Sequence, residues 1–99
     1  MTSLSPLVYE VLARNFSPAH QPLVAELLDQ HCGANLPLAG SADNIERIRC
    51  AVLKLASVQA DAVPRHIDMA QCDWRDVLVA AGFGSDVAAH RRWAWQETA

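Results

Sequence analysis

Cysteines and charged residues are scarce in this chain, and each scarcity excludes a class of protein. The three cysteines are odd in number and lie far apart, at Cys32, Cys50 and Cys72. That pattern does not suit a disulfide framework, so we interpret them as reduced thiols. Charged residues make up 19% of the sequence and hydrophobic residues 52%, a balance that excludes a disordered chain and favours a packed globule.

Long apolar runs and basic clusters are missing as well. No apolar run is long enough to cross a bilayer, and the first residues lack the charged and apolar segments of a secretory signal. The formal net charge is -3 and no third of the chain is basic overall, which argues against nucleic acid as a partner. We therefore expect a cytoplasmic protein that binds neither membranes nor nucleic acid.

The alternation of apolar and polar residues that marks strands is not sustained anywhere, whereas helix signals recur. Ser5 as an N-cap and Pro6 as the first helical residue predict a helix over residues 6–15. Pro22 and Gly33 bound a second helix in the same way. Residues 33–42 have no period and are rich in turn-forming residues, which predicts the longest loop.

The strongest helix signal begins at Asp43. Asp43 and Glu46 form a pair like a capping box, and Arg47 falls on the side that we expect to face solvent. The inward face is apolar at every third or fourth position, with Ile45, Ile48, Val52 and Leu55. This pattern predicts a helix at the centre of the fold.

Local signals in the second half predict two or three further helices. Asp61 can cap a fourth helix, and Asp73 a short fifth one that ends at Gly82. Phe83 is placed to fold back on that helix in a Schellman ending, and Ser85 opens the last helix. Together these signals predict a single all-α domain over residues 1–99, a compact orthogonal bundle of five or six short helices.

The residues that often carry chemistry lack the spacing that a catalytic or metal site needs. Potential metal ligands are spread along the chain without the paired spacing of zinc sites, at His31, Cys32, Cys50, His66, Cys72 and His90. Cys72 is the most plausible reactive thiol, but the neighbouring Asp73 disfavours its thiolate. Asp73 and Asp76 have helix-capping positions, and Asp68 has no catalytic context. We therefore expect no enzyme, no metal and no cofactor.

The C-terminal tryptophans are the most informative feature. Trp93 and Trp95 lie beside Arg91 and Arg92, and both residue types are enriched at interface hot spots. Two residues apart, the indoles point about 200° from each other on a helix, so they cannot both enter one core. An interaction surface and a harmless exposed indole are about equally compatible with this pattern.

Three functions follow in order of preference. The leading hypothesis is a non-catalytic protein-interaction module, either a homodimer or a small adaptor, with Trp93, Trp95, Arg91 and Arg92 as its surface. The runner-up is a binder of a small apolar or anionic ligand, with the same four residues at the mouth of a pocket. A thiol-dependent or metal-dependent enzyme ranks last.

A resemblance covers about the last half of the chain. Residues 45–55 and the segment DWRDVLVAAGFG at 73–84, followed by His90 and Trp93, resemble a group of small uncharacterised bacterial proteins. The resemblance implies a bacterial, cytosolic, helical protein. It implies no activity, cofactor or catalytic residue.

Overall fold

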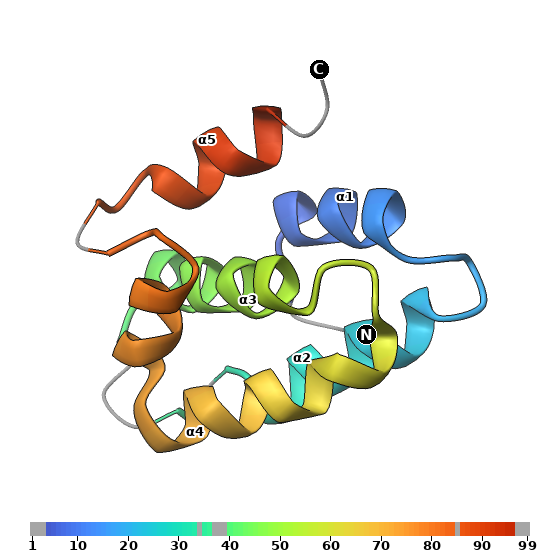
Figure 1. The fold of residues 1–99 in the computed structure, drawn as a ribbon, viewed down its shortest axis with the longest axis horizontal. Coiled ribbons are helices and arrows are strands. Elements are labelled where there is room, and N and C mark those ends of the chain that lie inside the picture. Colours follow the sequence, from blue (N-terminus) through green and yellow to red (C-terminus); the bar gives the residue numbers. More distant parts are fainter. Residues whose placement is uncertain (1–3, 34, 37–39, 85, 97–99) are drawn as a thin grey trace.

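Within the residues that it describes, the computed structural model contains five α-helices and one short 3₁₀ helix (Figure 1). The structure describes residues 4–33, 35–36, 40–84 and 86–96. Its elements are α1 (Pro6–Asn15), α2 (Gln21–His31), α3 (Ala42–Ala56), η1 (Ala60–Ala62), α4 (Val63–Ala80) and α5 (Ala89–Gln96). No strand occurs within these ranges, so the prediction of an all-α bundle is confirmed.

The first helix has the bounds and the cap that the sequence predicts. The Ser5 hydroxyl accepts a hydrogen bond from the backbone N–H of Val8 at 3.4 Å. Pro6 follows as the first helical residue, where a missing N–H costs nothing because no acceptor lies within the helix. The inward face of α1 then buries Val8, Val11 and Leu12.

Helix α3 lies at the centre of the molecule, as its apolar pattern predicts. It contacts α1, α4 and α5, and Figure 1 shows it between α1 and α5 on one side and α4 on the other. Ile48, Val52 and Leu53 are completely buried. Shortening a buried leucine to alanine typically costs about 2–5 kcal/mol, so truncation of Leu53 is expected to destabilise the core.

The predicted cap of α3 is wrong. Ser41, two residues before Asp43, is the N-cap, and its hydroxyl accepts from the backbone N–H of Asn44 at 3.2 Å. Glu46 therefore lies too far along the helix to return to the cap, because a capping box needs its acid three residues after the N-cap. Arg47, expected on the solvent side, is only 8% exposed.

The boundary between the predicted fourth and fifth helices is a kink within α4. Asp73 has φ −158° and ψ 99°, and its carboxylate accepts from the backbone N–H of Arg75 at 3.1 Å. Asp73 thus caps the second part of α4 as predicted, and its own non-helical backbone divides the two parts. Asp61 caps nothing: it lies in η1, and α4 starts after Ala62, whose side chain has no acceptor.

The predicted Schellman ending of α4 is confirmed. Gly82 has φ +81°, a left-handed conformation that favours glycine. The backbone N–H of Phe83 donates to the Leu78 carbonyl at 2.9 Å, and that of Gly82 to Val79 at 3.0 Å. Phe83 is buried, so the ending returns the chain to the core before α5. Ser85, the predicted start of the last helix, lies outside the described residues, and α5 begins at Ala89.

Candidate interaction surface

Helix α5 is fixed to the bundle by buried residues. His90 is completely buried, and its Nε2 lies 2.8 Å from Oε1 of Glu46 on α3. Ala94 is also completely buried, and its carbonyl accepts from the Arg14 guanidinium of α1 at 2.8 Å. Contacts at both ends of this short helix therefore set its orientation, and with it the direction of every exposed side chain on α5.

The two tryptophans diverge around α5 as their spacing predicts. Trp93 is partly buried, and its ring centroid lies 5.9 Å from that of Phe83 in a tilted arrangement. Trp95 is 66% exposed. Trp93 thus closes the core over the end of α4, whereas Trp95 presents most of its indole to solvent.

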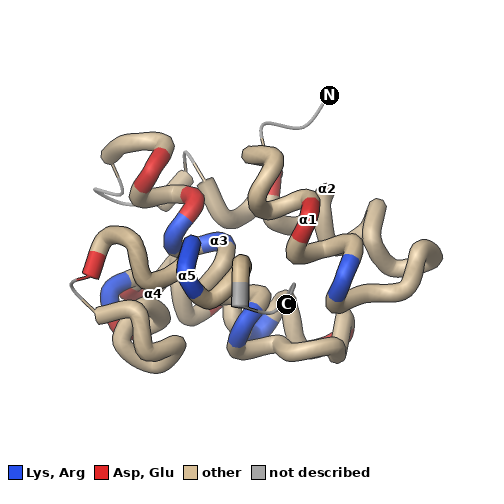
Figure 2. Tube along the Cα trace, turned by 90° about the horizontal axis from the view of Figure 1, so that it is seen from above, with Lys and Arg blue, Asp and Glu red and all other residues tan. Residues whose placement is uncertain are grey.

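The two predicted arginines lie at the edge of the same helix. Arg91 is about half exposed and lies 3.5 Å from Asp43 Oδ1 and 3.6 Å from Glu46 Oε1. Arg92 is 58% exposed and forms an ion pair with Asp86. Figure 2 shows the basic residues of α5 over α3, near acidic ones. Exposed ion pairs contribute little stability, so the pairs of Arg92 with Asp86 and of Arg91 with Asp43 can be exchanged at low cost.

A pocket of about 470 Å³ lies between the start of α3 and the approach to α5. Arg91 lines it together with Arg47, whose guanidinium donates to the Asn44 amide oxygen at 2.9 Å and the Gly84 carbonyl at 3.0 Å. Neither tryptophan nor Arg92 lines this pocket. Of the four predicted residues, this pocket is therefore lined by Arg91 alone.

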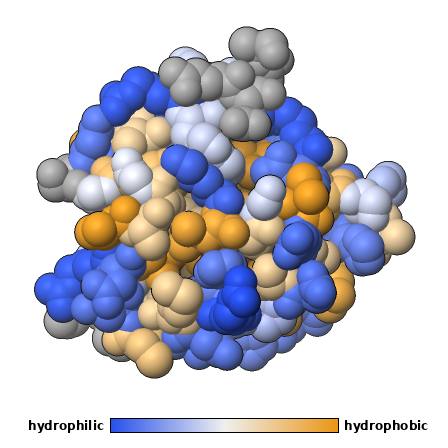
Figure 3. All heavy atoms as spheres, in the orientation of Figure 1, coloured by the Kyte–Doolittle hydropathy of each residue, from blue (hydrophilic) through white to orange (hydrophobic). Residues whose placement is uncertain are grey.

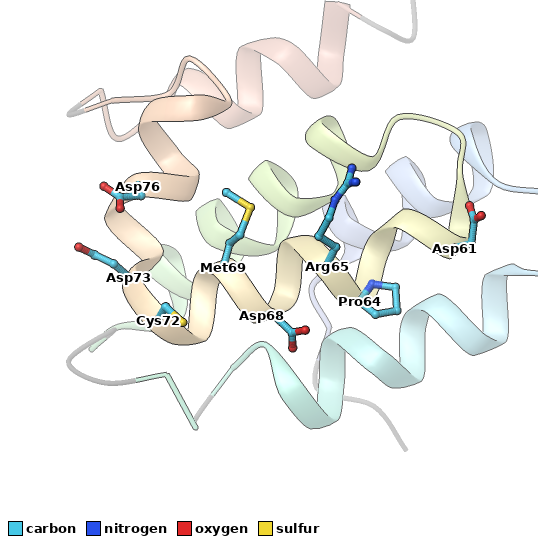
Figure 4. A pocket seen from close by; sticks show the side chains of 8 residues that line it. All are labelled: Asp61, Pro64, Arg65, Asp68, Met69, Cys72, Asp73 and Asp76. Carbon is cyan, nitrogen blue, oxygen red and sulfur yellow. The ribbon is translucent and has the colours of Figure 1, made fainter.

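A larger groove, of about 670 Å³, follows the outer face of α4 and was not predicted from the sequence. Figure 4 shows its side chains along the helix on both sides of the kink. They are Asp61, Pro64, Arg65, Asp68, Met69, Cys72, Asp73 and Asp76. The spacing of these positions by three or four residues is the signal that could have revealed a shared helix face.

The groove carries a large share of the charge of the chain. Four of its lining residues are aspartates and one is an arginine. The whole chain has 11 acidic and 8 basic residues, so seven of each remain elsewhere. The formal net charge of -3 is therefore matched by the excess of acid in this groove alone.

The three cysteines differ sharply in environment. Cys32 and Cys50 are completely buried, and burial raises the pKa of each thiol to about 12. Cys72 is exposed in the α4 groove, and all three are free thiols. Among the described residues, no three His, Cys, Asp or Glu side chains come close enough together to hold a metal ion.

His66 is an unusual residue that the sequence does not single out for burial. It is 9% exposed, and both ring nitrogens lack a hydrogen-bond partner. Burial, and then the nearby Arg65 charge, hold the pKa of the imidazole below its usual value. His66 therefore stays neutral in the folded chain at neutral pH.

Glu46 combines burial with several partners. Burial opposes its ionisation, but hydrogen bonds from Ser5 and His90 outweigh that effect and lower the pKa of the carboxyl. The side chain is 14% exposed. Glu46 is thus ionised, and from the second turn of α3 it contacts Ser5 at the start of α1 and His90 on α5.

No helix among the described residues is both long and apolar enough to span a membrane. Comparisons with protein-family models, curated proteins and solved structures find no match to this chain. The resemblance of residues 45–55 and 73–84 to small bacterial proteins stays a prediction. The function has to be inferred from the side chains themselves.

Proposed function

We propose that the chain is a non-catalytic protein-interaction module that associates with itself through α5. The observation that carries the proposal is the 66% exposure of Trp95 on a helix whose other aromatic residue, Trp93, packs on the core. Arg91 and Arg92 lie at the rim of this surface, which we call the α5 surface. Trp and Arg are the residue types that most often dominate binding energy at interfaces.

The rigidity of α5 supports this role. His90 and Ala94 hold the helix in place from its buried side, so Trp95 is displayed in a defined direction. A preorganised anchor loses less conformational entropy on binding than a side chain on a mobile segment. The α5 surface therefore suits binding better than an indole on a frayed terminus would.

The distribution of exposed apolar side chains bears on the affinity that we expect. Figure 3 shows apolar side chains at several separate places on one face of the molecule, interrupted by hydrophilic ones. Association through Trp95 therefore relies on one anchor residue rather than on a broad apolar patch. An anchoring tryptophan contributes about 2 kcal/mol or more, which corresponds to roughly thirtyfold in affinity.

The environment of the thiols supports a role without catalysis. Cys32 and Cys50 are buried with a raised pKa, so neither supplies a thiolate at neutral pH. Cys72 is exposed in the α4 groove, and no histidine is among the residues that line this groove to act as its base. A binding function needs none of these groups.

The runner-up, a small-ligand binder, has weaker support. The pocket beside Arg91 contains Arg47 as a second cation, but Asp43 lines the same pocket and Glu46 lies 3.6 Å from Arg91. Two carboxylates next to two guanidiniums leave little net attraction for an anion. The protein-interaction proposal therefore has the stronger basis.

Sedimentation velocity over a wide concentration range tests the proposal. We expect the wild type to associate reversibly. We expect Trp95→Ala to lower the association constant about thirtyfold. Leu23→Ala is the matched control, because Leu23 is 53% exposed on α2 and away from the α5 surface. Trp93→Ala is less informative, since loss of its contact with Phe83 also destabilises the fold.

Two results would contradict the proposal. A wild type that stays monomeric at high micromolar concentration would contradict the proposed self-association. A dimer that Trp95→Ala and Leu23→Ala weaken equally would place the interface outside the α5 surface.

A further inference from the structure

We draw no further inference here: the strongest candidate, the acidic groove along the outer face of α4 around Met69, is a cluster of aspartates beside the exposed Cys72, and nothing in the structure shows what covers it.

Discussion

His90 Nε2 lies 2.8 Å from Oε1 of Glu46 although 44 residues separate the two along the chain. The His90 side chain is 1% exposed and that of Glu46 is 14% exposed, so the contact is shielded from solvent. It joins α5 to α3 and sets the orientation of the helix that displays Trp95. The position of the α5 surface therefore depends on a buried polar pair.

Glu46→Ala should destabilise the fold because it leaves the buried His90 ring without its partner. A buried polar group that loses its hydrogen bond costs about 1–3 kcal/mol. Urea unfolding measures the loss. Asp43→Ala is the control, since Asp43 also contacts Arg91 but is 82% exposed, and it should change stability by less than about 0.5 kcal/mol. Equal losses of unfolding free energy for the two substitutions would show that the Glu46–His90 contact stabilises the fold no more than the exposed Asp43–Arg91 contact.

Stability should fall on acidification in two steps. The pKa of both His66 and Glu46 is lowered in the folded chain, so between the lowered and the ordinary value the unfolded chain binds more protons. The His66 contribution is present above its ordinary pKa of 6.5 and is lost as pH falls toward the lowered value. The Glu46 contribution is lost in the same way below 4.5. Unfolding free energies measured across this pH range should show both losses.

His66→Leu separates the first step from the second. It removes two buried ring nitrogens that have no partner, so stability at neutral pH should rise by about 1 kcal/mol. The decline of stability below pH 6.5 should then disappear while the Glu46 step remains. An unchanged profile in the His66 range would show that another group titrates there.

Gly82→Ala should cost about 1–2 kcal/mol, because φ is +81° and side-chain-bearing residues avoid that conformation. The nearest atom to an added Cβ is Lys54 Nζ at 3.7 Å, an ordinary contact, so the cost comes from the backbone. Gly82→Asn should lose less, since asparagine tolerates this region better. Thermal unfolding of the two variants compares them, and equal stabilities would contradict the assignment.

Thiol reagents should distinguish Cys72 from the other two cysteines. Cys72 is exposed, whereas Cys32 and Cys50 are completely buried. Native protein should therefore release one equivalent of the chromophore per chain in a fast reaction with a chromogenic disulfide. Cys72→Ser should abolish that fast phase. Fast reaction of all three thiols in native protein would show that the core opens on that timescale.

Local signals predicted the helix ends that depend on a few neighbouring residues. Ser5 with Pro6, and Gly82 with Phe83, act through bonds within one turn, so the sequence alone identifies them. The cap of α3 was misassigned because Ser41 and Asp43 are both good N-cap residues and only the path of the loop selects between them.

One feature of the candidate site that was not predicted depends on distant segments. Glu46 meets His90 only after α5 returns over α3, and no local pattern encodes that contact. The α4 groove was missed because Asp61, Asp68 and Asp76 were considered singly as caps or acids rather than as one helix face. In contrast, the divergence of Trp93 and Trp95 follows from helical geometry alone, and it was predicted.

The indole N–H resonances of the three tryptophans offer the most direct measurement of self-association through Trp95. A dilution series of two-dimensional nitrogen-correlated spectra, from millimolar to low micromolar protein, follows each indole separately, with Trp95→Ala to assign its signal. The Trp95 resonance should move with concentration along a binding curve, while that of Trp93, packed on Phe83, stays nearly constant. A Trp95 resonance that does not move over the whole range would contradict self-association through α5.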